Sequence, residues 1–592
     1  MAMNKEGASR WARITADNIG RPVAIVLDDQ VYSYPTVNAE ITGGRSEITG
    51  GFTPEEATDL ANVLESGKMD AQPEVISQRV IGPSLGQESI NKGLTSFIVA
   101  LVLLMIFMIC VYGVKAGNIA NMGLLFNLFF TAGILASFQT VLTLPGIAGI
   151  VLALGMAVDA NVIIFARIRE ELGTGKTLQS SVDIGFKKAL SAILDGNITT
   201  LIASVVLMIM GTGSVKGFAQ TLALGIVLSM ITALFVTKAL INGFIALGLK
   251  NEKLFGIAKK KKTVDFLSKG KIFAIISGVI IVAGIAAMVF FKVKTGNIMD
   301  YSLEFLGGTS TTATLTEDMS IEQIDETITP SIEQITGDGN VQITKVEGSN
   351  EIIVKTRTLT EDERNELSTL FTEEYNVDEG TITSETISAT VSGEMRRNSI
   401  ISVAVAVLCM LIYIWLRFSD YRFGVSSVLT LVHDVLVVLT FYAIARVSVS
   451  STFIACMLTI VGYSINATIV IFDRIRENKK DAADKLRIAA SRRRTKKKED
   501  EESVTLKDIV NTSITQTLSR SVFTSLTTFV MVLMLYILGV TSIREFALPL
   551  MIGIACGCYS SVCLAGFIWY TMRARKSVAI DDEDDDPDKN YV

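Results

Sequence analysis

The chain has 592 residues, of which 49% are hydrophobic and 19% charged, and its mean hydropathy is +0.45. This apolar content excludes a soluble protein of such length and indicates a polytopic membrane protein. The net charge of −6 says little about partners, because basic and acidic residues are concentrated in different segments.

The cysteines and histidines limit the chemistry that the chain can carry. All six cysteines lie in apolar segments, which favours a role in helix packing over disulfides or a metal site. His433 is the single histidine, so a histidine metal site or a serine triad is not expected. We therefore predict neither a catalytic site nor a bound metal.

Residues 1–93 are polar and mixed, and we assign them to the C-terminal part of a first external domain. An alternating run at 23–27, a turn and a second run at 31–34 predict a β-hairpin. Residues 53–64 are typical of an amphipathic helix, and residues 74–80 of a further strand. No signal peptide precedes this domain, so we expect a membrane helix upstream of Met1 in the full-length protein.

Eleven apolar runs follow, each near the length that a bilayer demands of a helix. They lie at 95–114, 122–138, 142–165, 190–210, 218–247, 272–291, 400–416, 423–444, 453–471, 522–538 and 546–570. Strongly basic stretches occur at 167–188, 259–262, 474–507 and 573–576. Under alternating topology these stretches share one side, which the positive-inside rule identifies as the cytoplasm.

The same alternation divides the chain into two membrane halves and places a second polar domain outside. The segments are a first membrane half at 94–250, a basic linker at 251–271, a helix at 272–291, the second external domain at 292–397, the rest of the second half at 398–572 with a basic cytoplasmic insertion at 473–515, and an acidic tail at 573–592. The external domain has the order strand, helix, strand, strand, helix, strand of a ferredoxin-like α+β fold. We place these elements at 311–315, 321–335, 341–346, 352–356, 361–374 and 381–390.

Asp159 stands out because it lies inside an otherwise apolar helical run, 155–165. An Asp at the centre of a membrane helix costs roughly 2.5 to 3.5 kcal/mol on insertion scales, so its presence indicates function. The small residues Ala148 and Gly155 share its helical face, which favours the close approach of another helix. The stretch returns at 462–476, so we interpret the two halves as a tandem duplication.

Other ionisable side chains lie within or at the ends of spans: Asp195, His433, Asp434 and Arg520. Each of them could instead satisfy a neighbouring helix or extend to the membrane interface. Arg520 shares one helical face with polar residues, which indicates a hydrated seam; these are Ser513, Gln516, Thr524 and Thr527. A buried guanidinium needs a carboxylate partner, and the predicted topology places Asp159 in the same half of the membrane.

A nucleotide site is not predicted. Gly175-Lys176-Thr177 matches the end of a phosphate-binding loop, but Glu170 stands where that loop needs its first glycine. The segment also follows a membrane helix instead of a strand, and we find no other nucleotide or nucleic-acid motif. ATP bound to this chain is therefore not the expected energy source.

Two sets of motifs cover nearly the whole chain. The first set includes Val158-Asp159-Ala160-Asn161-Val162, Asp195-Gly196-Asn197-Ile198-Thr199-Thr200 and Gly82-Pro83-Ser84-Leu85-Gly86. The second includes Phe305-Leu306-Gly307-Gly308-Thr309, Leu431-Val432-His433-Asp434, Asp473-Arg474-Ile475-Arg476-Glu477 and Gln516-Thr517-Leu518-Ser519-Arg520. These sets resemble the bacterial SecD and SecF translocase subunits, fused into one SecDF chain.

The resemblance implies twelve spans in two pseudo-symmetric halves, eleven of them within this sequence, related to the resistance-nodulation-division transporters. It implies a multi-pass protein of the bacterial inner membrane that uses the proton or sodium gradient to pull secreted polypeptides outward. The implied partners are the Sec channel with its accessory subunits, the unfolded secretory polypeptide and membrane lipid, without nucleotide or nucleic acid. The implied ion-coupling residues are Asp159 and Arg520, with the supporting candidates Asn161, Asp195, Asp434, Asn466 and Gln516.

The chain departs from the family pattern at two positions. Ala166 stands where the family usually has Glu, and Ala467 stands where SecF proteins usually carry an Asp of the ion relay. We therefore keep a passive scaffold or holdase with an uncoupled ion path as the alternative to an ion-driven translocase subunit. A small-molecule exporter ranks third, because exporters of that superfamily usually have much larger external domains.

Overall fold

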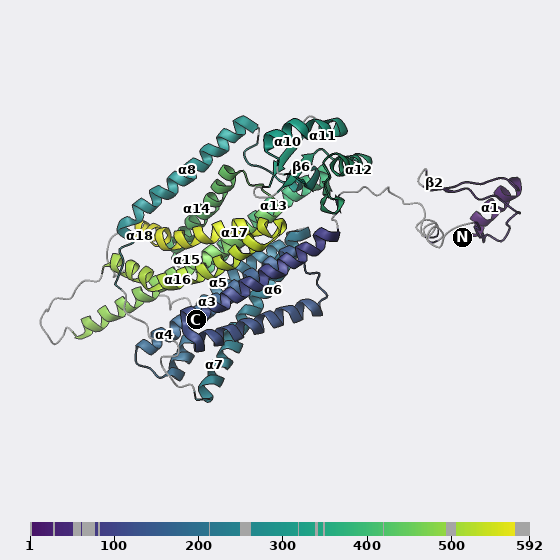
Figure 1. Cartoon of the computed structure of the whole chain (residues 1–592). Helices are drawn as coiled ribbons and strands as arrows, with labels where there is room; N and C mark the ends of the chain where they lie inside the picture. The colour runs from purple at the N-terminus through teal and green to yellow at the C-terminus, as the bar shows by residue number, and fades with distance from the viewer. Residues whose placement is uncertain are drawn as a thin grey trace. The chain divides into compact units, whose positions relative to one another are not determined.

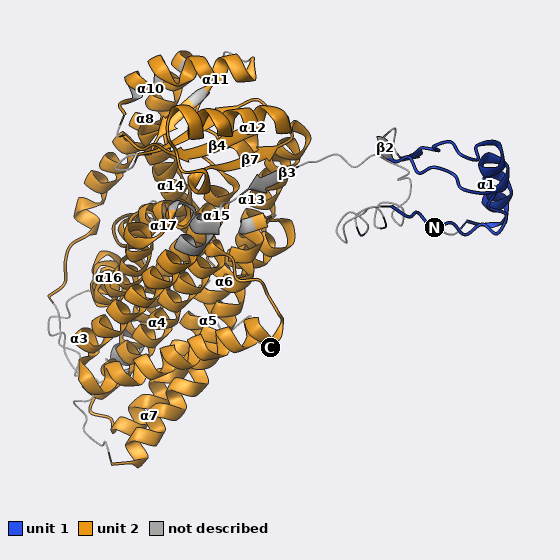
Figure 2. Cartoon of the chain, turned by 45° about the vertical axis from the view of Figure 1, so that its right-hand side comes forward, with its two compact units in different colours: residues 1–76 blue, residues 77–592 orange. Residues whose placement is uncertain are grey.

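The computed structural model describes residues 3–27, 30–50, 58, 61, 77–80, 83–211, 213–248, 262–295, 297–317, 319–337, 341–346, 350–417, 420–492 and 505–574. Figure 2 colours its two compact units, Met1–Ile76 and Ser77–Val592. The structure confirms the predicted class, a polytopic helical membrane protein with a small antiparallel sheet. Most of the helix predicted at 53–64, and the acidic end of the tail, lie outside the described residues.

The first unit contains a helix and a hairpin in its described residues. α1 (Lys5–Asp17) begins at Asn4, whose side chain accepts a hydrogen bond from the Gly7 amide at 2.8 Å. β1 (Ile25–Leu27) and β2 (Gln30–Ser33) pair antiparallel, as the alternating pattern predicted. We did not predict α1, because few of its residues are apolar.

The second unit contains a helical bundle. Ten helical segments of the described chain are long and apolar enough to cross a membrane. Their elements are α3 (Pro83–Ser137), α4 (Leu144–Gly173), α5 (Leu178–Met210), α6 (Gly213–Ile231) with η1 (Thr232–Val236) and α7 (Thr237–Ala246), η3 (Leu267–Lys269) with α8 (Gly270–Thr295), α13 (Ala389–Arg417), α14 (Tyr421–Ala445), α15 (Ser451–Arg492), α16 (Leu506–Leu538), and α17 (Thr541–Ser560) with η6 (Ser561–Ala565) and α18 (Gly566–Ala574). Threonine side chains cap several helix starts, at Thr143, Thr177 and Thr505.

Two predicted spans, 95–114 and 122–138, lie in the single element α3. The helix breaks at Gly113, where φ is 78° and ψ is 167°. The Asn121 amide donates to the Met105 carbonyl at 3.1 Å, although the residues are 16 positions apart. A straight helix would separate them by about 24 Å, so the two legs of α3 fold back on one another. The eleven predicted runs therefore occupy ten helical elements.

The sheet of the second unit has the order β3-β7-β4-β6-β5, and all neighbouring strands are antiparallel. The strands are β3 (Ser77–Val80), β4 (Gly308–Thr314), β5 (Gln342–Lys345), β6 (Glu351–Thr356) and β7 (Thr383–Ile387), with α9 (Leu303–Leu306), α10 (Ile321–Thr327), α11 (Thr329–Thr336), α12 (Glu361–Thr369), η4 (Leu370–Glu374) and η5 (Glu379–Thr381) around them. A small core joins strands and helices; its members include Ala313, Ile324, Ile332, Ile352, Val354 and Phe371. The sheet and its helices lie at one end of the bundle (Figure 1).

Two expectations about boundaries need correction. The strand predicted at 74–80 was assigned to the first external domain, but β3 pairs with β7, from Ser77 opposite Ile387 to Val80 opposite Ser384. The sequence did not show this, because strand pairing depends on residues three hundred positions away. The basic insertion 473–515 is also partly regular, because α15 continues as a helix to Arg492.

The loops at the two ends of the bundle are identified by their contacts. At the sheet end, the loop before α15 joins the segment before α9 through Ser302 N–H to Val449 O at 2.9 Å. At the other end, ion pairs link neighbouring basic and acidic loops, as between Lys507 and Asp265 at 2.9 Å and between Arg573 and Asp420 at 3.5 Å. The described basic loops therefore gather at the end opposite the sheet.

Candidate functional site

Asp159 lies on α4 and is 8% exposed. The Asn466 amide of α15 donates to its Oδ2 atom at 3.1 Å. The two residues are 307 positions apart, which is also the offset between Phe165 and Phe472 in the repeated stretch. Equivalent positions of the two halves therefore meet face to face, and only one of them carries a charge.

Glycines allow the helices to come this close. A Cβ at Gly196 of α5 would lie 2.0 Å from Asn466 Oδ1, and one at Gly462 of α15 would lie 2.8 Å from the Thr200 backbone of α5. Gly155, which shares the helical face of Asp159, faces Thr528 of α16. Each half thus packs its central helix against a helix of the other half, α4 against α16 and α15 against α5.

Arg520 of α16 is partly buried, and its charge acts on Asp159. No guanidinium nitrogen of Arg520 lies within 4.0 Å of a carboxylate oxygen in the described chain, so the ion pair expected from the sequence is not formed in this conformation. Its buried Nη2 atom and the Oδ1 atom of Asn466 make no hydrogen bond to the described residues. Asn466 and Ala467 also keep partly exposed surface, so the seam beside Asp159 is not closed.

A ring of four ion-paired side chains joins the halves about two to three turns further along α4 and α15. Arg167 contacts Glu170 at 2.9 Å and Glu477 at 3.1 Å, and Arg474 contacts Glu477 at 2.8 Å and Glu170 at 3.4 Å. Arg167 and Arg474 are repeat equivalents, and so are Glu170 and Glu477, because each pair is 307 positions apart. We call this set the inter-half ring. Sequence reasoning missed it, although Arg-Ile-Arg-Glu occurs in both copies.

Gln516 contacts the inter-half ring and not Asp159. Its Oε1 atom accepts from Arg474 Nε at 2.6 Å and from Asn478 Nδ2 at 3.0 Å. Gln516 was predicted as a supporting residue because it shares a helical face with Arg520. It lies one helical turn before Arg520, which is enough for it to reach Arg474 instead of Asp159. The polar face of α16 therefore contacts two different groups.

The remaining predicted residues have partners of their own. The Asp195 carboxylate accepts from Arg417 Nε at 2.7 Å and from Tyr413 at 2.9 Å, which joins α5 to α13. Asn161 accepts from Thr237 at 3.3 Å, within the first half. Asp434 is bonded to His433, Ser464 and Ser560 in the second half. The structure thus brings Asp159, Asn466 and Arg520 together and places the other candidates elsewhere.

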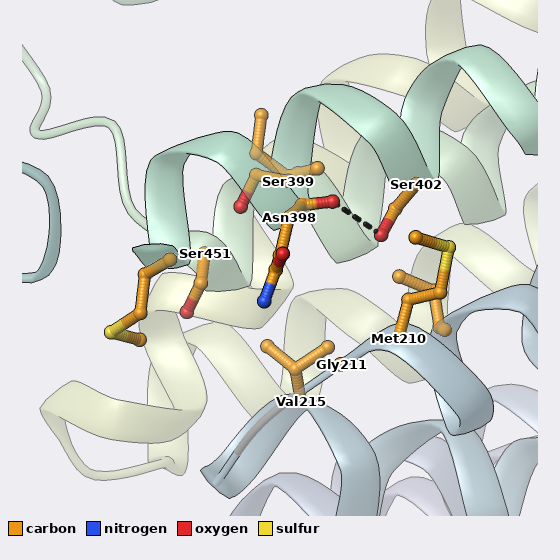
Figure 3. Close-up of a pocket in the computed structure, with 10 residues that line it drawn as sticks. Met210, Gly211, Val215, Asn398, Ser399, Ser402 and Ser451 are labelled. Atoms are coloured by element: carbon orange, nitrogen blue, oxygen red, sulfur yellow. Dashed lines mark hydrogen bonds between the residues drawn. The ribbon is translucent and has the colours of Figure 1, made fainter. Parts of the chain in front are cut away.

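A small hollow also lies between the halves, near the start of α15. Asn398 projects into it from α13, between Ser451 and Val215 (Figure 3). Ser451 is 15 residues from Asn466, which is roughly 22 Å along a helix. The hollow is therefore separate from the surroundings of Asp159.

Comparison with known proteins connects this geometry to a family. A model described as "Protein export membrane protein SecD/SecF, C-terminal" matches residues 62–246 and again 367–575, and one described as "SecDF, P1 head subdomain" matches residues 1–71. The chain is 34% identical to the protein translocase subunit SecDF of Bacillus subtilis, over 92% of this chain and 72% of that protein. The chain belongs to the SecDF family.

Other SecDF proteins give the same result. The protein translocase subunit SecDF of Thermus thermophilus is 35% identical over 95% of this chain and 72% of its own length. The crystal structure of a Thermus SecDF, titled a translocon-associated membrane protein, has a TM-score of 0.77 and 35% identity and covers 97% of this chain and 75% of that one. A SecDF crystal structure titled as a super-membrane-facing form has a TM-score of 0.64 and 34% identity, with 97% and 74% covered. The resemblance seen in the motifs is confirmed, and because one model matches both halves, so is the duplication.

Proposed function

We propose that this chain is a membrane subunit of the Sec protein-export machinery that uses the proton or sodium gradient to drive late translocation of secreted polypeptides. The observation that carries the proposal is the buried Asp159, which faces its repeat equivalent Asn466 and lies near a guanidinium that forms no ion pair with the described residues. The names of the relatives, which describe translocase subunits, support the assignment to the Sec machinery.

The charge state of Asp159 is the proposed coupling element. Burial favours the proton-bound or ion-bound form of a carboxylate, and a neighbouring guanidinium favours the free form. A movement that changes the distance between α4 and α16 would therefore load or unload Asp159. The two helices belong to different halves, so ion binding at Asp159 would bias how the halves are arranged.

The sheet is the proposed contact for the translocating polypeptide. The basic loops gather at the opposite end of the bundle. This supports an inner-membrane protein whose sheet lies on the extracytoplasmic side. β5 (Gln342–Lys345) is an outer strand of the sheet, and an extended chain can pair with such an edge through backbone hydrogen bonds. The Sec channel, its accessory subunits and lipid are the further proposed partners. We propose no cofactor, only a transported proton or sodium ion.

Substitution of Asp159 tests the proposal. Asp159→Asn keeps the size of the side chain and removes its charge, so secretion into inverted vesicles should fall to the level measured without a gradient. Asp183→Asn is a matched control, because Asp183 pairs with Lys238 at the exposed surface. Arg520→Lys, made in the parent chain, should retain only part of the gradient-dependent secretion, since lysine lacks the planar fork of arginine. Normal, gradient-dependent secretion by Asp159→Asn would refute ion coupling at this site.

The passive scaffold is kept as a second candidate because of Ala467. It lies beside Asn466 at the partly exposed seam, so the position where relatives usually carry an Asp is accessible in this chain. Ala467→Asp should leave secretion equal or increase it if the chain is ion-driven. A scaffold should be indifferent to Ala467→Asp, Asp159→Asn and Arg520→Lys alike.

A further inference from the structure

A second buried carboxylate lies in the middle of the second half. Asp434 of α14 is 0% exposed. Its Oδ1 atom lies 2.9 Å from His433 Nδ1, and its Oδ2 atom accepts from Ser560 of α17 at 2.9 Å and from Ser464 of α15. Three helices therefore supply the polar groups around one carboxylate.

The contacts continue from His433 to α8. His433 Nε2 lies 2.9 Å from Ser277 Oγ, Ser277 Oγ lies 3.3 Å from the Tyr559 hydroxyl, and Tyr559 donates to the Phe273 carbonyl at 2.9 Å. The result is an unbroken line of hydrogen-bonding groups from Asp434 to a backbone carbonyl of α8.

The direction of these bonds determines how many protons the line holds. The Phe273 carbonyl can only accept, so Tyr559 must donate to it, and Ser277 must donate to Tyr559. His433 Nε2 then has to donate to Ser277. The remaining contact, His433 Nδ1 to Asp434 Oδ1, needs one more proton, either on the imidazole or on the carboxyl group.

Either placement leaves the pair with no net charge. An imidazolium next to a carboxylate and a neutral imidazole next to a carboxylic acid both sum to zero, whereas loss of the proton leaves a buried negative charge. Among the described residues, no lysine or arginine forms an ion pair with Asp434. An unpaired charge is costly in a membrane interior, so a proton shared by the pair avoids that cost.

α15 connects this pair to Asp159. Ser464, which donates to Asp434, is two residues from Asn466, which donates to Asp159. The helix therefore contacts one buried carboxylate in each half at nearly the same depth. A displacement of α15 would change the hydrogen bonds of both.

We propose that His433 and Asp434 form a proton-binding site of the second half, connected to Asp159 through α15. The proposal rests on the proposed function for its role in coupling, and on the hydrogen-bond geometry alone for the site itself. The groups that face the pair from the packed helices are Ser464 of α15, Cys556, Tyr559 and Ser560 of α17, and Ser277 of α8. The alternative is a purely structural role, in which uncharged hydrogen-bonded groups only hold the helices together.

The chain offers a specific probe, because His433 is its only histidine. The 592-residue chain, labelled with ¹⁵N-histidine and reconstituted in nanodiscs, gives one imidazole signal, whose two nitrogen shifts report protonation. We expect a bonded Nε2–H and release of a single proton in a pH titration. In Asp434→Asn that step should vanish, whereas Asp420→Asn, at the start of the same helix, should leave it unchanged.

A second, less disruptive variant is needed if Asp434→Asn fails to fold. Ser560→Ala removes one hydrogen bond to the carboxylate and leaves the rest of the line in place, so the two nitrogen shifts of His433 should differ from those of the parent protein. A signal that stays neutral with its proton on Nδ1 at every pH, in the parent protein and in Ser560→Ala, would overturn the site. A titration that shifts with sodium but not with potassium would overturn it in favour of a metal ion.

The same measurement separates the site from the proposed function. The titration of His433 should persist in Asp159→Asn, because the pair has its own proton. If it persists while secretion proves independent of Asp159, the ion-coupling proposal fails and the site stands. If secretion depends on Asp159 but neither nitrogen shift of His433 changes with pH, the site fails and the proposed function stands.

Discussion

Asp159 and Asn466 show how one duplicated position has taken two roles. They occupy equivalent places in the two copies and hydrogen-bond to each other at 3.1 Å. Two carboxylates at this distance would repel, and one would have to keep a proton. The amide at 466 avoids this conflict and holds the Asp159 carboxylate by donating to it.

The first prediction follows from that pair. Asn466→Asp should place two carboxyl groups in contact, so that one proton is shared and Asp159 no longer exchanges its ion freely. Gradient-dependent secretion should fall sharply, while Ala467→Asp at the next position should not reduce it. Equal secretion rates for Asn466→Asp and the parent chain would show that the contact with Asp159 is not needed for coupling.

A second prediction concerns pH outside the membrane. The Arg357 guanidinium, 2.5 Å from Glu363, lowers the pKa of that carboxyl group to about 2. The stability from this pair should be fully present above the unfolded pKa of about 4.3 and be lost as pH falls toward 2. Both side chains are partly exposed, so we expect a change of about 1 kcal/mol or less.

Hydrogen exchange of α12 in the full chain measures that pH effect. Glu363→Gln keeps the capping box with Thr360 and loses the ion pair, so the exchange of α12 should become less dependent on pH in this range. Acid sensitivity equal to that of the parent chain would assign the effect to another carboxylate.

The apolar parts of single helices followed from the sequence, because an apolar run is a local property. The polar first turns of α5, α13 and α16 did not, since these helices begin at Leu178, Ala389 and Leu506, more than ten residues before the predicted runs. The separate runs 95–114 and 122–138 match the two legs of α3, but the turn at Gly113 was not predicted, since it depends on one glycine conformation and on contacts between the legs. The extension of α15 to Arg492 was missed because its charged residues suggested a loop. The pairing of β3 with β7 depends on residues far apart in the chain, which one sequence does not reveal.

Gly113 gives the third prediction. A side chain at φ 78° is strained, so Gly113→Ala should destabilise the turn of α3 by about 1 to 3 kcal/mol. Gly133→Ala is the control, because Gly133 lies in the same element, and an alanine Cβ there would meet no atom of the described chain within 4 Å, so the change should be neutral or slightly stabilising. Thermal unfolding in detergent compares the two. Equal midpoints would show that the turn tolerates a side chain.

On the scale of the whole molecule, the two halves contact each other at several levels. Asn466 meets Asp159 within the membrane, Arg417 of the second half meets Asp195 of the first, and the inter-half ring lies beyond them. The sequence indicated Asp159 through its cost in an apolar helix. It could not show that Arg520 lies near Asp159 without forming an ion pair, or that Asp195 has Arg417 as its partner. Those contacts depend on how the two halves pack together, and the sequence of a single helix does not reveal that packing.

The last prediction tests whether the halves move against each other. Cysteines in place of Glu170 and Arg474, in a chain without its native cysteines, should be joined across the inter-half ring by a short cleavable thiol reagent, because the native side chains are 3.4 Å apart. If ion binding rearranges the halves, this bridge should block gradient-dependent secretion, and cleavage of the reagent should restore it. Cysteines at Glu171 and Lys188, which pair at 2.8 Å within the first half, are the matched control and should permit secretion when bridged. Full secretion with the inter-half bridge in place would mean that the halves work as one rigid body, and that any coupling passes through side-chain changes alone.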